Sequence, residues 1–304
     1  MSWEEIKQWL QVRHLENEVL DHLADTVDPQ IKKVRGYRNK LREPLAVCKE
    51  YSKELVATIP GPILADRKKW SASPQLKALL AGSENPEQLL AAEQGSEPAN
   101  YLLLTMTRTD RTIFGREKRG EMVVGDAKMQ TVTFTDHKVF PLGATETEAR
   151  AGLEQLSIET IILAASRKLV AVLAELSDLY QQQSNLKAMS RMFGEGGRSH
   201  NVFGVQTVEQ KEKLEKVTEL LEETTHDLEQ YRSKLETPKQ RLESLAEYLS
   251  QPEKILTSEP FSVVLDWRNV IVDKLEEKAV SLALTQFSLP DEMQRYGVLV
   301  GFEL

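Results

Sequence analysis

Residues 214–249 read LEKVTELLEETTHDLEQYRSKLETPKQRLESLAEYL, and leucine recurs in them at every seventh position: Leu214, Leu221, Leu228, Leu235, Leu242 and Leu249. A seven-residue repeat falls on one narrow stripe of a helix. A second set lies three residues further on and completes a coiled-coil seam: Val217, Thr224, Tyr231, Pro238 and Leu245. Such a helix cannot bury its stripe alone, so the pattern predicts a partner helix in this chain or in another.

A second seam lies immediately upstream, where mostly apolar residues alternate by four and three positions: Ile158, Ile162, Ala165, Leu169, Val172, Leu176, Leu179, Gln183 and Leu186. Residues 193–204, FGEGGRSHNVFG, separate the two seams and hold too many glycines for a helix to cross at low cost. We therefore predict an antiparallel helical hairpin over residues 143–252, with a tip at 194–204 and arms of about 60 Å. In the alternative, residues 214–249 pair with their copy in a second molecule.

The first segment, residues 1–60, is predicted to be helical and basic in its middle. Asp28-Pro29 has the form of a helix cap before a first-turn proline, so a helix should begin there. Pro44 lies inside the expected helix and should kink or interrupt it, because proline lacks the donor that its turn needs. The apolar face of this helix would comprise Ile31, Val34, Leu41, Leu45, Cys48, Leu55 and Ile59.

The middle of the chain changes character twice. Residues 61–99 are predicted to hold an exposed acidic linker and two short helices, each begun by a capping residue and a proline: Ser73-Pro74 and Asn85-Pro86. Residues 100–142 favour a small antiparallel sheet, because apolar and β-branched runs occur there between glycines. The expected strands cover residues 101–107, 112–114, 121–124 and 130–135, and in the last of them Val132 and Phe134 should face the same side.

Two further signals concern the hairpin. Thr145 and Glu148 form a capping-box pattern that should open its first arm. Thr237-Pro238 interrupts the second arm, and because the leucine spacing passes through it we expect a kink rather than a break. Residues 253–304 mix helical and strand signals, and their strands could join the sheet of residues 100–142. Within them we expect strands at 261–265 and 296–304 and a helix at 275–284.

These patterns together predict a mainly α chain with a small β-sheet, an α+β fold in which a helical-bundle base carries the long antiparallel coiled-coil hairpin. The bundle is expected because residues 161–174 are apolar on more than one face, which an isolated pair of helices would not require.

Composition limits the classes of protein that fit. The net charge of −8 argues against a general nucleic-acid coating protein. A single cysteine, Cys48, excludes an intrachain disulfide and a cysteine-based zinc cluster, and its apolar neighbours predict a buried small hydrophobe. Residues 1–5 do not resemble a secretory signal, and the most apolar run, residues 161–174, is too short to span a bilayer. We therefore expect a cytoplasmic protein without a transmembrane segment.

The densest positive charge lies on a segment expected to form an amphipathic basic helix: Lys32, Lys33, Arg35, Arg38, Lys40 and Arg42. These six side chains could contact a polyanion, either nucleic acid or an anionic membrane. The alternative is a solvated face that balances acid elsewhere in the chain, which is the more frequent reason for such runs. A second basic group lies in and between the predicted strands, where it can simply protect sheet edges: Arg108, Arg111, Arg116, Lys118 and Arg119.

The tip of the predicted hairpin carries apolar and basic residues together: Met192, Phe193, Arg198, His200 and Phe203. Exposed apolar groups at the end of a long arm are costly unless a partner covers them. A contact with a protein partner at the tip is one interpretation. The other is that the phenylalanines only close the last turn of the hairpin.

Catalytic signals are weak. The five histidines lack metal-binding spacing, so neither a metal nor a cofactor is expected. Asp136 and His137 are adjacent, but a turn at a strand end explains them. No phosphate-binding glycine loop and no nucleophile elbow occurs in the chain. We therefore lean against an enzyme, without excluding a site between sheet and helices.

The leading functional hypothesis is a non-enzymatic coiled-coil interaction or scaffolding protein of unknown process. It would act through a protein partner or through self-association. The alternative is a polyanion-binding module that uses residues 32–42, with nucleic acid possible but not favoured.

Overall fold

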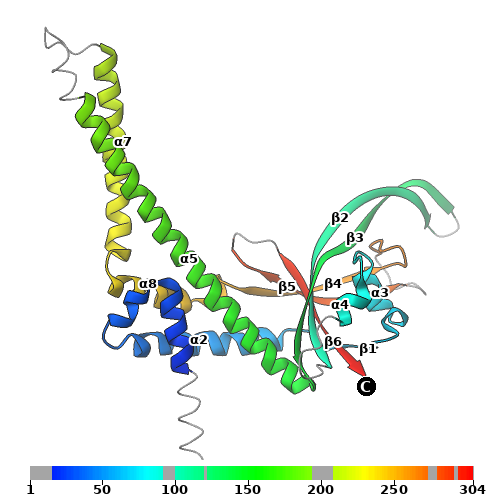
Figure 1. Ribbon diagram of the computed structural model, residues 1–304. Helices are drawn as coiled ribbons and strands as arrows, with labels where there is room; N and C mark the ends of the chain where they lie inside the picture. The colour runs from blue at the N-terminus through cyan, green and yellow to red at the C-terminus, as the bar shows by residue number, and fades with distance from the viewer. Residues whose placement is uncertain are drawn as a thin grey trace, which may run out of the picture. The chain divides into compact units, whose positions relative to one another are not determined.

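The computed structural model describes residues 16–91, 100–119, 122–193, 208–272, 279–290 and 294–303 (Figure 1). The chain divides into two compact units, each built from two separate stretches: Met1–Ala46 with Ile162–Ser250, and Val47–Ile161 with Gln251–Leu304. The divisions fall inside the helices α2 (Tyr37–Ala57) and α5 (Glu146–Arg191).

The second unit is organised by a six-stranded sheet. Its path runs in the order β3-β2-β6-β5-β4, and β1 pairs with β6 outside that path. The pairing of β1 with β6 is parallel and the other pairings are antiparallel. The strands are β1 (Ile63–Asp66), β2 (Tyr101–Arg119), β3 (Met122–Gly143), β4 (Thr257–Leu265), β5 (Val280–Ser288) and β6 (Arg295–Glu303).

Both faces of the central strands are covered. Successive side chains of a strand point to opposite faces, so Leu102, Leu104 and Met106 of β2 lie on one face and Leu103 and Thr105 on the other. All five are buried. The first face belongs to a hydrophobic core that includes residues of α3 (Pro74–Leu80) and residues next to it in the chain. The short elements η2 (Trp70–Ala72), α4 (Pro86–Ala91) and η4 (Pro252–Lys254) complete this unit.

The prediction of a helical-bundle base with a small sheet is wrong. The sheet has six strands and carries a large hydrophobic core of its own. Because residues 102–106 of β2 and most of β6 are buried on both faces, their apolar runs lack the polar alternation by which a half-exposed strand is recognised. The helix predicted at 275–284 is also wrong over its described part, where β5 begins at Val280.

The strands β2 and β3 form a long curved ribbon of 19 and 22 residues (Figure 1). The sequence predicted several short strands there, separated at glycines such as Gly115. In the structure β2 continues through Gly115, and a Cβ at that position would lie 2.4 Å from the Cε of Met129. This glycine therefore gives room to a cross-strand side chain instead of ending the strand. The prediction that Val132 and Phe134 share a face is confirmed, since both are buried in the same core.

The first unit is helical. It contains a helix over residues 16–27, the turn η1 (Pro29–Lys33), the beginning of α2, α5 from Ile162 onward, α7 (Val208–Leu235) and α8 (Pro238–Leu249). In this unit α5 and α7 lie side by side and run in opposite directions (Figure 1). Gln183 donates to Thr225 at 2.9 Å, and Glu175 accepts from Tyr231.

The leucine repeat is divided between two helices. α7 ends at Leu235, and α8 begins at Pro238 with a complete capping box between Thr237 and Gln240. The expected kink at Thr237-Pro238 is therefore wrong: the cap satisfies the backbone donors of a new helix start. The interruption expected as one outcome at Pro44 is also wrong, because α2 continues from Tyr37 to Ala57 with that proline inside. The other outcome, a kink, stays a prediction.

Candidate functional site

The basic segment of residues 32–42 is not one helix. Lys32 and Lys33 belong to η1, while Arg38 lies on α2, which begins at Tyr37. Gly36 separates the two elements and has a φ of +79°, a left-handed conformation that glycine adopts without steric cost. The predicted continuous amphipathic helix is therefore wrong, and the cations do not form one helical stripe.

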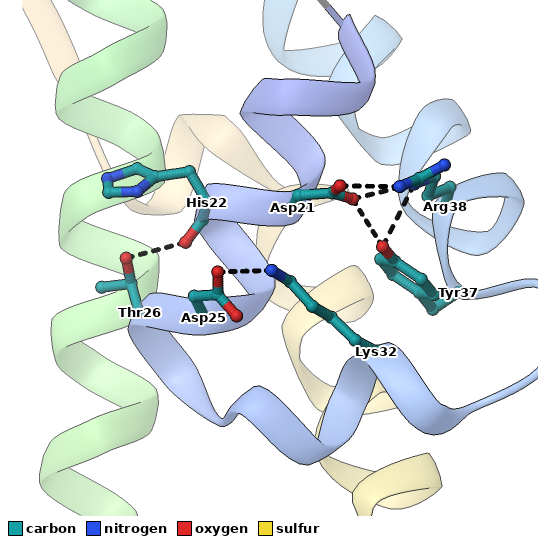
Figure 2. A network of polar contacts seen from close by, with 7 residues as sticks. All are labelled: Asp21, His22, Asp25, Thr26, Lys32, Tyr37 and Arg38. Carbon is teal, nitrogen blue, oxygen red and sulfur yellow. Dashed lines mark hydrogen bonds and ion pairs between the residues drawn. The ribbon is translucent and has the colours of Figure 1, made fainter.

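Arg38 is bound to an acidic partner (Figure 2). Its Nε and Nη2 atoms donate to the two carboxylate oxygens of Asp21 at 2.8 and 2.6 Å, and the hydroxyl of Tyr37 donates to the same carboxylate at 2.5 Å. The hydrogen bond from Arg38, followed by that from Tyr37, lowers the pKa of Asp21 from 3.8 to about 2. Asp21 and Arg38 thus join the helix of residues 16–27 to α2.

The other cations of this segment differ in their surroundings. Lys32 forms an ion pair with Asp25 (Figure 2). Lys40 lies 3.3 Å from Glu243. Arg42 donates to the side-chain oxygens of Asn39 and Asn17 at 3.1 and 2.9 Å. Lys33 and Arg35 are exposed and form no ion pair with the described residues. Four of the six predicted polyanion contacts therefore already have polar partners in the first unit.

The hairpin-tip prediction falls largely outside the described residues. Arg198, His200 and Phe203 are outside them. Met192 is 70% exposed just after the end of α5, and Phe193 is half-buried. A second exposed apolar side chain, Val208, begins α7.

Asp136 and His137 occupy a bulge in β3, where the register with β2 shifts between Thr105 and Thr107. Asp136 has a φ of +49°, and Nε2 of His137 lies 2.9 Å from the carbonyl oxygen of Leu79. The carboxylate of Asp136 accepts from Arg295, so the two side chains have separate partners. The expected turn at a strand end is therefore wrong, because both residues lie inside β3, at a bulge.

Cys48 is fully buried, as its apolar neighbours predicted. Burial raises the pKa of its thiol from 9.0 to about 12. The nucleophilic thiolate is thus scarce at neutral pH.

The most exposed large aromatic side chain among the described residues is Trp267, at 76%. It lies in a turn that Asp266 organises: Oδ1 of Asp266 accepts from the backbone N–H groups of Arg268 at 2.8 Å and of Val270 at 2.9 Å. Oδ2 accepts from Nε of Arg268 at 2.9 Å. Asn269 has a φ of +60°, which asparagine tolerates better than most residues.

The Trp267 turn is also anchored to the sheet. The backbone N–H of Val132 donates to the carbonyl of Asn269 at 2.9 Å, and that of Ile271 donates to Gln130 at 2.8 Å. These bonds attach the turn to β3. On the neighbouring strand β2 of the same ribbon, the side chain of Phe114 is 71% exposed. Sequence reasoning missed Trp267. The signal was an aromatic residue between Asp266 and Asn269, two residue types that favour turns.

No protein-family model, curated protein or solved structure matches this chain significantly. Across the described ranges, no helix combines the length and the apolar character that crossing a bilayer requires.

Proposed function

We propose that this chain is a non-enzymatic interaction protein that holds a partner protein through the turn of residues 266–270, with Trp267 as the anchor. The observation that carries the proposal is the combination of exposure and order at Trp267. A tryptophan that is 76% exposed costs solvation free energy, and here the backbone around it is held by several hydrogen bonds.

A preorganised tryptophan suits a binding anchor for two physical reasons. Tryptophan is enriched among the residues that dominate binding energy at interfaces. A turn that is ordered before binding loses little conformational entropy when the partner arrives. The guanidinium of Arg268 lies 5.7 Å from the centre of the Trp267 ring, within the range of a cation–π interaction.

The neighbouring ribbon supports a partner with an apolar pocket and an acidic rim. In the register of β2 with β3, Arg111 lies opposite Thr131 and Phe114 lies opposite Lys128. Thr131 also forms a β-bridge with Val270 of the turn. The side chains of Arg111 and Lys128 are exposed and form no ion pair with the described residues. Acidic groups on a partner would find complementary charge there, which favours rapid association.

The test begins with photo-crosslinking in the native host. A photoreactive phenylalanine derivative placed at position 267 should yield a discrete crosslinked protein, whereas the same derivative at Val170, an exposed position on α5, should not. With the purified partner, Trp267→Ala should weaken binding about 30-fold or more, while Leu64→Ala, at another exposed apolar position, should leave it unchanged.

Identical crosslinks at positions 267 and 170, or unchanged affinity of the Trp267→Ala variant, would refute the anchor. A parallel derivative at Met192 tests the arm end. A specific crosslinked product from position 192 alone would still indicate an interaction protein, but its contact site would be the end of α5 and not Trp267. Saturable binding of single-stranded nucleic acid that depends on Trp267 would indicate a different partner, namely a nucleic acid whose base stacks on the Trp267 ring.

A further inference from the structure

The second unit contains a cavity of about 270 Å³ on the face of the sheet opposite to α3. Its walls come from four strands, β2, β3, β5 and β6, and from the first part of α5, with Ile59, Leu256 and Leu289 completing the lining. This place is separate from the Trp267 turn, so the inference goes beyond the interaction proposed above.

Most of the lining is apolar. Eight of the thirteen lining residues carry hydrophobic side chains: Ile59, Leu103, Phe140, Leu153, Leu156, Leu256, Phe287 and Leu289. The hydroxyls of Ser157 and Thr160 already donate to the α5 carbonyl oxygens of Leu153 and Leu156, at 2.8 and 2.7 Å. The part of the wall that α5 contributes therefore favours an aliphatic or aromatic body.

The remaining polar groups are neighbours in the sheet. Thr105 pairs with Lys138 across β2 and β3, and Nη2 of Arg295 donates to Oγ1 of Thr105 at 3.3 Å. Lys138 is exposed and forms no ion pair with the described residues. The polar lining thus brings two cations together beside an otherwise apolar cavity.

Arg295 retains a donor. Its Nη1 donates to Oδ2 of Asp136 at 2.5 Å, and its Nη2 donates to the carbonyl oxygen of Asp136 at 2.6 Å. The Nε atom is buried and has no hydrogen-bond partner among the described residues. A buried N–H without an acceptor is unfavourable, and a hydrogen bond from a guanidinium to a carboxylate is among the stronger ones in proteins.

We propose that this cavity binds a small aliphatic monocarboxylate, whose carboxylate is held by Arg295 and Lys138 and whose chain lies among the leucines and phenylalanines. A ligand with one negative charge would neutralise the site, because Asp136 already offsets one of the two cations, Arg295 and Lys138. A cavity of about 150 Å³ holds benzene, so 270 Å³ has room for about eleven non-hydrogen atoms by the same ratio. Octanoate has about that size and is the probe of choice.

The test is calorimetric titration of the full chain with octanoate, 1-octanol and octylamine. Octanoate should bind with one-to-one stoichiometry. 1-Octanol and octylamine should bind about tenfold more weakly or worse, because neither supplies an anion to the guanidinium.

Three variants separate the charged head from the apolar chain. Lys138→Gln should weaken octanoate about three- to fivefold and leave 1-octanol unchanged. Lys77→Gln is the matched control, because Lys77 is exposed on α3, which covers the other face of the sheet. Leu156→Trp should block both ligands by filling the cavity, and its melting temperature reports whether it remains folded.

Absence of saturable octanoate binding at concentrations below its aggregation would overturn the proposal. Equal affinity for the three probes would also overturn it, and so would identical octanoate affinities of the Lys138→Gln and Lys77→Gln variants. Lys138 is exposed, so that comparison stands even if the Leu156→Trp variant does not fold.

Discussion

Arg38 and Asp21 form a two-point contact in which Nε and Nη2 of the guanidinium reach separate oxygens of one carboxylate, at 2.8 and 2.6 Å. The two residues are seventeen positions apart and join the helix of residues 16–27 to α2. Tyr37 adds a third donor to the same carboxylate. Two-point contacts of this kind are among the stronger ionic interactions in proteins.

Asp21→Asn should destabilise the first unit by about 1 kcal/mol at pH 7, a value reduced because both partners are partly exposed. The folded pKa of Asp21 is lower than its ordinary value, so the carboxylate stabilises the folded state above pH 3.8, and this contribution disappears as the pH falls to about 2. Urea unfolding of the wild type and the variant should therefore converge in acid. Asp178→Asn, at an exposed position on α5, is the control. A difference that persists unchanged at pH 2 would contradict the ionic explanation.

Thr237→Ala should lower the free energy of unfolding by about 1 kcal/mol, because Oγ1 of Thr237 caps α8 by accepting from the backbone N–H of Gln240. Thr218 is exposed inside α7, so Thr218→Ala should change stability by less than about 0.5 kcal/mol. Urea midpoints measured by circular dichroism compare the two variants. Equal effects would indicate that residue 237 does not begin a helix.

Gly82→Ala should destabilise the second unit by about 1–3 kcal/mol. A Cβ there would lie 2.2 Å from the carbonyl oxygen of Phe134, and a backbone atom cannot rotate away as the end of a side chain can. Gly61 has no atom within 4 Å of the same position, so Gly61→Ala is the matched control. The control should be neutral or more stable by up to about 1 kcal/mol, because alanine restricts the unfolded chain. Thermal unfolding measures both, and a neutral Gly82→Ala variant would mean that α3 does not approach β3 this closely.

Cys48 should resist a thiol reagent such as Ellman's reagent in the native protein at pH 8. Its pKa of about 12, raised by burial, leaves little thiolate at that pH, and the side chain is inaccessible. Absorbance should report one thiol per chain only after urea is added, since the sequence has one cysteine. Rapid stoichiometric labelling without urea would show that the environment of Cys48 opens readily.

Local patterns in the sequence were sufficient to predict features, such as helix caps, that depend on residues three or four positions apart. Ser73 caps α3, as its place before Pro74 predicted. The carboxylate of Glu148 accepts from the backbone N–H of Thr145 at 3.3 Å, as the capping-box pattern predicted. These interactions form within one turn of chain, so the order of residues alone determines them.

Only the tertiary structure decided the features that join distant segments. β6 pairs with β2 although nearly two hundred residues separate Leu104 from Val298, and burial on both faces removed the alternation that would have revealed a large sheet. The partner of Arg38, the exposure of Trp267 and the meeting of Arg295 with Thr105 likewise depend on which segments the fold brings together. The sequence by itself determined where several helices begin and that Val132 and Phe134 share one face of their strand. The long-range pairing of strands decided the size of the sheet and the place of both candidate sites.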